Sequence, residues 1–285
     1  MEEERSANGG GVERAVTVFL AGAECPFTCS FCDLWRWTLD GPTPPSALPA
    51  QLAGALGSLA PPVPHRLKLY NASNFFDRRA VPAEDLPRIA ELASPFAAVT
   101  VESHANTVGQ LSLEFAGLLA SKLEVAVGLE TVHPVAAAQL NKKLDLERFD
   151  RAAAFLAEHD IDLRAFVLLG APYVPAEESI DWTVRTVAYA ASRGAGRIAV
   201  IPVRGGNGEM ERLQSLGHFV PPTLVQLESA LERCLGLGPA VVSADLWDLE
   251  RLPACEACRS ERVARLRQMN LSGRGQAAVS CSVCA

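Results

Sequence analysis

The chain has 285 residues, of which 49% are hydrophobic, and its formal net charge is −7. This length supports one sizeable core with a small appendage, and the negative charge disfavours a large nucleic-acid-binding surface. No apolar stretch approaches the roughly 20 residues that span a bilayer, and the acidic start Met1–Arg5 does not resemble a secretory signal. We therefore expect a cytoplasmic protein without a membrane partner.

Cysteine usage points to metal binding. Seven of the eight cysteines lie in tight clusters. In a chain without an export signal, such clusters indicate metal ligands rather than disulfides. Cys234, which stands alone in a predicted helix, is expected to be a buried core thiol.

The order of predicted elements indicates an α/β protein. Residues 1–13, with three consecutive glycines, are predicted to be a flexible tail. Beyond them, short β-rich runs alternate with stretches of helical spacing, which predicts βα units around a parallel sheet. The expected strands are 15–20, 66–70, 98–101, 124–129, 163–169 and 197–202, with helices near 48–59, 83–93, 112–121, 134–140, 146–159, 177–192 and 222–235. Six such units are too few for a closed eight-stranded barrel.

The loop after the first predicted strand carries three cysteines at the spacing C-x3-C-x2-C: Cys25, Cys29 and Cys32. Thiolates are the usual ligands of a 4Fe-4S cluster, and a cluster held entirely by protein takes four of them. A closed structural zinc site also takes four ligands. Three thiolates therefore leave one iron open to bind a substrate or cofactor. The alternative, three buried or disulfide-forming cysteines, is disfavoured because all three thiols lie within eight residues of one loop.

This loop resembles the signature of the radical S-adenosylmethionine (radical SAM) enzymes, C-x3-C-x-aromatic-C, with Phe31 as the aromatic residue. The resemblance implies a partial (β/α)6 TIM-like barrel, here over residues 14–244. It also implies a 4Fe-4S cluster on the three cysteines, whose open iron binds S-adenosylmethionine (SAM). One electron, from a donor such as flavodoxin or ferredoxin, then cleaves the cofactor to methionine and a 5′-deoxyadenosyl radical that abstracts a hydrogen atom from substrate.

The resemblance assigns cofactor contacts to the ends of later strands. The segment with Asn71, Ser73 and Asn74 corresponds to the one that binds the methionine amino group, although a plain Asn-rich turn is the alternative. Glu102 is a cofactor contact or supports one, and a surface acid at a loop start is the alternative.

Two further strand ends complete the implied cofactor site. Glu130 and Lys142, twelve positions apart, correspond to the residues that bind the ribose hydroxyls and the methionine carboxylate. Phe31 and Leu169 are the candidates for the surroundings of adenine.

The C-terminal residues 245–285 are predicted to form a separate small module. They contain two C-x2-C pairs separated by 22 residues, Cys255/Cys258 and Cys281/Cys284. Four thiolates fit tetrahedral zinc and also suit a second iron–sulfur cluster. Zinc is slightly favoured because so short a module needs a metal to hold it. A pair of disulfides is the third alternative.

Residues 70–235 resemble the branch of the family that contains the catalytic subunit of Elongator and the radical SAM subunit of archaeosine synthase. The substrate is therefore a small molecule or an RNA nucleoside, and the five arginines of the tail are either an RNA-binding feature or a solvated helix face. Two alternatives remain open: an enzyme that transfers a methyl group or sulfur with help from the second metal site, and a non-catalytic iron–sulfur or zinc protein acting as a partner subunit.

Overall fold

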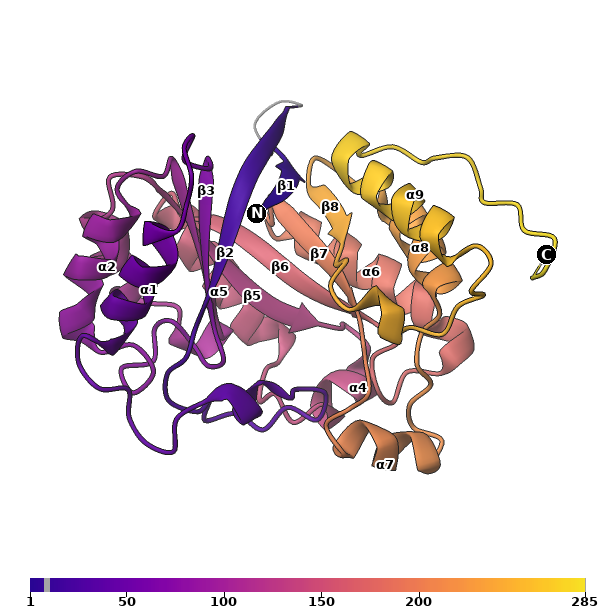
Figure 1. Ribbon diagram of the computed structural model, residues 1–285. Helices are drawn as coiled ribbons and strands as arrows, with labels where there is room; N and C mark the ends of the chain where they lie inside the picture. The colour runs from indigo at the N-terminus through magenta and orange to yellow at the C-terminus, as the bar shows by residue number, and fades with distance from the viewer. Residues whose placement is uncertain (8–10, 285) are drawn as a thin grey trace.

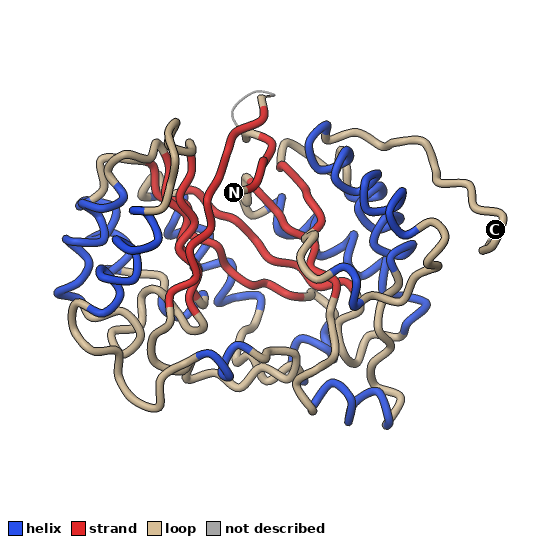
Figure 2. The backbone as a smooth tube through the Cα atoms, in the orientation of Figure 1, coloured by secondary structure: helices blue, strands red, loops and turns tan. Residues whose placement is uncertain are grey.

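The computed structural model describes residues 1–7 and 11–284 and shows a strongly curved sheet with helices on its outer face (Figures 1 and 2). The eight strands are hydrogen-bonded in chain order: β1 (Glu2–Arg5), β2 (Val12–Leu20), β3 (Arg66–Asn71), β4 (Ala98–Ser103), β5 (Lys122–Glu130), β6 (Asp162–Leu169), β7 (Arg197–Pro202) and β8 (Val241–Ala244). Strands β2 to β8 are parallel, and β1 pairs antiparallel with β2. The partial-barrel fold is confirmed.

The helices follow the strands as βα units require. They are α1 (Ala47–Gly57), α2 (Leu86–Ala93), α3 (Gln110–Leu118), α4 (Pro134–Gln139), α5 (Leu146–Glu158), α6 (Ser179–Ser192), α7 (Glu209–Ser215), α8 (Leu224–Cys234) and α9 (Arg259–Ser272). All six predicted strands are present within a few residues of their expected bounds. The short strands β1 and β8 and the helix α7 were not predicted. No helix in the described ranges combines the length and hydropathy needed to cross a bilayer.

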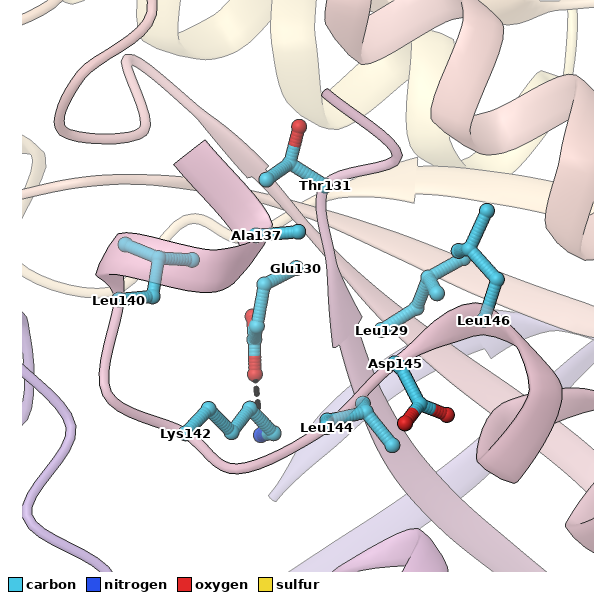
Figure 3. Close-up of a pocket in the computed structure, with 9 residues that line it drawn as sticks. All are labelled: Leu129, Glu130, Thr131, Ala137, Leu140, Lys142, Leu144, Asp145 and Leu146. Carbon is cyan, nitrogen blue, oxygen red and sulfur yellow. Dashed lines mark hydrogen bonds and ion pairs between the residues drawn. The ribbon is translucent and has the colours of Figure 1, made fainter. Parts of the chain in front are cut away.

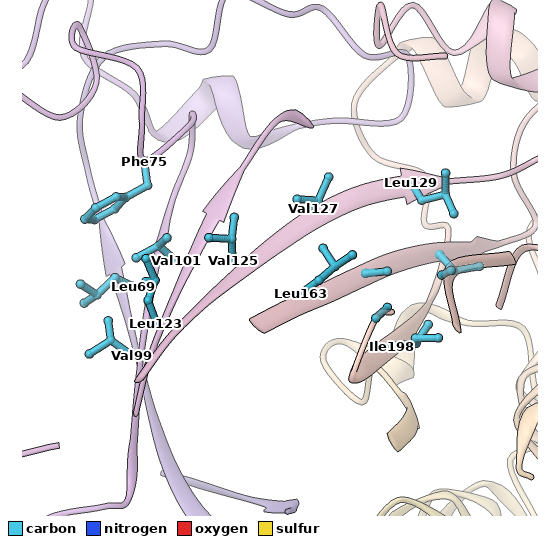
Figure 4. Packing of buried hydrophobic residues seen from close by; sticks show 14 of the residues in the cluster. Leu69, Phe75, Val99, Val101, Leu123, Val125, Val127, Leu129, Leu163 and Ile198 are labelled. Atoms are coloured by element: carbon cyan, nitrogen blue, oxygen red, sulfur yellow. The ribbon is translucent and has the colours of Figure 1, made fainter. Parts of the chain in front are cut away.

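The main hydrophobic core lies between the sheet and its outer helices (Figure 4). Leu69, Val99, Val125 and Leu163, from four neighbouring strands, are all buried there. Because side chains alternate along a strand, the residues between them face the other side of the sheet, which encloses a cavity of about 1190 Å³. The same strands therefore build a dry outer core and an interior cavity whose wall carries both charged and apolar side chains.

The N-terminal residues are not a flexible tail where the structure describes them. Glu2–Arg5 pair with Val12–Ala15, and β1 lies near the gap between β2 and β8 in Figure 1. Glu4 forms ion pairs with Lys68 and with Arg164 inside the barrel. Glu2 and Glu4 of this segment are thus the partners of buried cations. Gly9 and Gly10 lie outside the described residues.

Glu124 is the centre of a charge cluster at the amino-terminal end of the barrel. It is 1% exposed and accepts hydrogen bonds from Thr100 (2.9 Å), Arg164 (2.7 Å) and Arg197 (3.0 Å). Burial by itself raises the pKa of the Glu124 carboxyl, but Arg164, Arg66 and Arg197 outweigh it and hold that pKa far below the usual range. The cluster fixes the closed end of the barrel, opposite the loops that carry the cysteines.

The C-terminal segment shares the barrel's core rather than having its own. Leu266 and Met269 of α9 are fully buried in the main hydrophobic cluster, and α9 packs against α8. The change of composition near residue 245 therefore marks a strand-to-helix transition, not a boundary between two cores.

Candidate active site

The three cysteines of the predicted cluster site lie on the loop that leaves the carboxyl end of β2. Each thiol is half-buried. Burial raises the pKa of Cys29 to about 12 and that of Cys32 to about 11, and Cys25 adds to both shifts. Thiols with such raised pKa values ionise near neutral pH only if a nearby cation, such as a metal ion, stabilises the negative charge of the thiolate. The donor set therefore fits an iron–sulfur cluster.

Three asparagines fasten this loop. Asn74 Nδ2 lies 3.4 Å from Cys25 Sγ, Asn141 Nδ2 donates to the Thr28 carbonyl (3.0 Å), and Asn207 Nδ2 donates to the carbonyls of Ser30 (2.8 Å) and Cys32 (3.1 Å). They come from the loops after β3, β5 and β7. Of the three, only Asn74 was singled out from the sequence as a site residue. The contacts hold the cysteine loop across the mouth of the barrel.

His104 gives the loop a fourth support that sequence reasoning missed. Its ring stacks on Phe27 with 3.9 Å between centroids and an interplanar angle of 17°. Its Nδ1 accepts from the Asn106 N–H, so the proton lies on Nε2, which donates to the Lys142 carbonyl at 2.9 Å. Burial and the neighbouring Lys142 lower the pKa of His104 to about 4, which keeps the ring neutral. His104 thus connects the cysteine loop to the Lys142 loop.

Glu130 and Lys142, which the resemblance assigned to two different groups of one cofactor, form an ion pair with each other. Lys142 Nζ lies 2.6 Å from Glu130 Oε1, and both groups are largely buried (Figure 3). Burial alone lowers the pKa of Lys142, but Glu130 and Cys29 more than offset it and raise that pKa. Lys142 therefore stays charged between the cysteine loop and Glu130.

The end of β5 is shaped for this pair. A β-bulge falls between Gly128 and Glu130, and Glu130 has a φ of +67°, a conformation that non-glycine residues rarely adopt. A Cβ atom at Gly128 would collide with the Glu130 carboxylate and the Lys142 ammonium group. Glycine therefore leaves room for the ion pair to cross the strand, and a Cβ atom there would displace the ends of both side chains. Backbone strain at such a point is typical of functional sites.

Two predicted contacts after β3 have unsatisfied polar atoms. Neither the Asn71 side-chain amide nor the Ser73 hydroxyl has a hydrogen-bond partner among the described residues, although both side chains are more than 90% buried. Buried polar groups without partners are rare because their desolvation is uncompensated. Ser73 immediately precedes Asn74, the neighbour of Cys25. Asn71 shares its face of β3 with Leu67 and Leu69, so it points toward the helices rather than into the cavity.

The predicted adenine neighbour on β6, Leu169, does not face the cavity. Leu169 is fully buried in the outer core, whereas Leu168 lines the cavity together with Phe31. A strand exposes alternate residues to each face, so a shift of one position reverses the assignment. Phe31 also packs against Leu140 and Leu168 in a small hydrophobic cluster at the mouth.

Glu102 lies at the cavity wall, as expected for a site residue and not for a surface acid. It lines the cavity with Cys32 and Glu130, and its carboxylate has no hydrogen-bond or ion-pair partner in the described part of the chain. Burial raises the pKa of Glu102 to about 7, in spite of the attraction of Lys142. A partly protonated carboxyl group therefore faces the cavity beside the cysteine loop.

Aromatic side chains line one side of the same cavity. Phe19 packs edge-to-face on Trp247 (5.5 Å) and on Tyr70 (6.3 Å), and Tyr70 packs on Phe166 (6.1 Å). Phe19 is 60% and Trp247 55% exposed, although both line a hollow. Apolar surface left open in a cavity is typical of a ligand site. Sequence periodicity did not identify this wall, because its members come from four separate segments.

The four cysteines of the tail also come together. Their sulfur atoms all lie within 4.8 Å of one another, and Cys258 Sγ and Cys284 Sγ are 3.6 Å apart. Arg262 donates to Cys258 Sγ at 3.1 Å and to Glu228 at 2.5 Å. The set can hold a metal, as predicted. Arg262 and Arg265 are not part of a solvated face, since both pair with the buried Glu228, whereas Arg267 and Arg274 are exposed.

Comparison with solved structures defines the fold class. The chain is similar to methylornithine synthase (PylB), with a TM-score of 0.51 and 12% identity over 93% of this chain and 84% of that one. It is also similar to Elp3 from Methanocaldococcus infernus, with a TM-score of 0.54 and 12% identity over 81% of this chain and 56% of that one. Coproporphyrinogen III oxidase (HemN) from Escherichia coli, described as a radical SAM enzyme, gives a TM-score of 0.51 and 14% identity over 74% and 49%. The chain thus has the radical SAM fold that its cysteine loop predicted.

Sequence comparison adds one relative. An uncharacterized protein of Methanocaldococcus jannaschii is 24% identical over 186 residues, which make up 63% of this chain and 51% of that protein. The chain therefore spans about half the length of this curated relative. No protein-family model matches the sequence.

Proposed function

We propose that this chain is a radical SAM enzyme that holds a 4Fe-4S cluster on Cys25, Cys29 and Cys32 and removes a hydrogen atom from a substrate bound in the barrel. The observation that carries the proposal is the convergence of Cys32, Glu102 and Glu130 on one cavity, with Lys142 paired to Glu130 behind them. These side chains come from three separate strand ends and meet only because the sheet is curved. An external one-electron donor would dock at the mouth.

The residues of the site would bind and orient the cofactor. Lys142 offers a compact cation for a carboxylate, and Glu130 offers two acceptors for hydroxyl groups. In the structure these two groups satisfy each other, and a ligand that carries both a carboxylate and neighbouring hydroxyls could satisfy both instead. Ser73 supplies a buried hydroxyl that has no partner among the described residues. When bound, the cluster and SAM supply the one-electron and hydrogen-abstraction chemistry.

The cavity has room for a small substrate beside the cofactor. At about 1190 Å³ it exceeds the volume of typical small-molecule sites, and its exposed aromatic edges favour a flat or apolar group. A small molecule or a single nucleoside fits this description. Of the tail arginines, Arg262 and Arg265 do not support RNA binding, because both are engaged with Glu228.

Anaerobic reconstitution tests the proposal. With dithionite and SAM, the wild-type protein should release 5′-deoxyadenosine. Cys29→Ala should lose the cluster absorbance and the product. Cys234→Ala, which removes a fully buried thiol of the outer core, should keep both. An intact cluster that yields no 5′-deoxyadenosine would refute the enzyme and favour a non-catalytic partner subunit.

A further inference from the structure

The four tail cysteines have the spacing of ligands to a single ion. A tetrahedral zinc site with Zn–S bonds of about 2.3 Å places its sulfurs about 3.8 Å apart. The observed limit of 4.8 Å for all sulfur pairs, and the 3.6 Å between Cys258 and Cys284, match that geometry. In a 4Fe-4S cluster each thiolate binds a different iron, and in a 2Fe-2S cluster two thiolates bind each iron, so at least the sulfurs on different irons lie farther apart than they do around one ion.

The surroundings compensate the charge that four thiolates around a divalent ion would carry. Arg262 Nε donates to Cys258 Sγ at 3.1 Å, and the same guanidinium is held by Glu228, which is 3% exposed. Cys258 is also the N-cap residue of α9, where the helix dipole favours negative charge. A hydrogen-bonded residue behind a ligand of this kind commonly tunes the affinity of a metal site.

The four cysteines flank α9, two before it and two after it. Arg265 of α9 donates to the carbonyls of Gln276 (2.8 Å) and Ala277 (2.9 Å), which lie on the extended chain leading to Cys281. A metal bound by both cysteine pairs would therefore close a loop around this helix.

The helix α9 covers the free edge of β8. The Asn270 side chain donates to the Ala244 carbonyl and accepts from the Ala244 N–H, both at 2.8 Å, as a neighbouring strand would. Asn270 and Leu271 also line the cavity. We propose that one zinc ion, bound by Cys255, Cys258, Cys281 and Cys284, fastens α9 against β8 and so holds this wall of the cavity. This inference does not depend on the proposed radical chemistry.

Metal analysis of the full chain tests the identity of the ion. One zinc per chain should be present in the wild type and in a variant in which Cys25, Cys29 and Cys32 are all replaced by alanine, and absent in Cys281→Ser. X-ray absorption at the zinc edge should show four sulfur ligands at about 2.3 Å. Iron remaining in the variant without the first three cysteines, a metal–metal distance in the absorption data, or no metal at all would overturn the proposal.

Hydrogen exchange tests the role of the ion. Exchange of the amides in α9 and β8 should accelerate at least tenfold when the wild type is stripped by a chelator, and return on adding zinc. The chelator arm does not require Cys281→Ser to fold. Arg262→Gln should weaken zinc binding roughly 10- to 100-fold, whereas Arg274→Gln, an exposed tail arginine, should not. Zinc removal that leaves the exchange of α9 unchanged would show that the ion does not hold this wall.

Discussion

Replacing Glu124 by glutamine should destabilise the barrel strongly, because the substitution keeps the shape and removes the charge. Arg164 and Arg197 would lose a carboxylate partner at 2.7 and 3.0 Å in a region where Glu124 is 1% exposed. Removing one charged partner of a buried ion pair lowers the free energy of unfolding by about 3–5 kcal/mol. For a chain of this length the unfolding entropy is about 0.6 kcal/mol/K, so the melting temperature should fall by about 5–8 °C.

Urea denaturation at several pH values is the assay, with Glu114→Gln, an exposed acid on α3, as the matched control. The folded-state pKa of Glu124 is lowered from 4.5, so the stability that its charge contributes is fully present above about pH 4.5 and is lost as pH falls through the folded-state pKa. The difference in the free energy of unfolding between wild type and Glu124→Gln should thus be constant from pH 8 to 5 and become smaller in acid. A difference below about 1 kcal/mol, or one that does not change with pH, would refute the role given to this cluster.

Three further predictions concern the mouth of the barrel. Gly128→Ala should abolish SAM binding, measured by calorimetry, while leaving the fold intact, because its Cβ meets the side chains of Glu130 and Lys142. The control Gly117→Ala on α3 places its Cβ in open space and should bind SAM normally. Equal affinity for SAM in both variants would contradict the steric argument. Asn207→Asp keeps the oxygen that accepts from the Met210 N–H but loses the two hydrogen bonds that the amide donates to the cysteine loop. At about 1 kcal/mol per hydrogen bond, iron release to a chelator should be roughly tenfold faster or more. An unchanged release rate would show that the cysteine loop does not need these two hydrogen bonds. Burial raises the folded-state pKa of Glu102 from 4.5 to about 7. The stability that this carboxyl group contributes to the metal-free protein is therefore present below about pH 4.5 and lost by about pH 7, a decline of at most about 3 kcal/mol in the free energy of unfolding. Glu102→Gln should lack this decline, and parallel pH profiles of unfolding free energy for the two proteins would refute the raised pKa.

Local sequence patterns were enough to predict most of the secondary-structure elements and the cysteine loop. The six predicted strands are apolar runs whose β-rich composition reflects burial on the outer face, and each reappears within a few residues of its predicted bounds. The spacing of Cys25, Cys29 and Cys32 is a property of one short segment, so it needed no tertiary information. Glu130 and Lys142 were singled out as site residues by a family resemblance, but their ion pair with each other was not predicted.

Only the tertiary structure decided which side chains face the cavity and what holds the cysteine loop. Leu168 rather than Leu169 lines the cavity because the face of each residue depends on where the strand begins to pair. The stacking of His104 on Phe27 joins residues 77 positions apart, and the acids of β1 became buried partners because cations from β3 and β6 surround them. A sequence shows which side chains are charged or aromatic, but not whether they are solvated or buried. Contacts between distant segments decide that, and these contacts exist only once the sheet has curved.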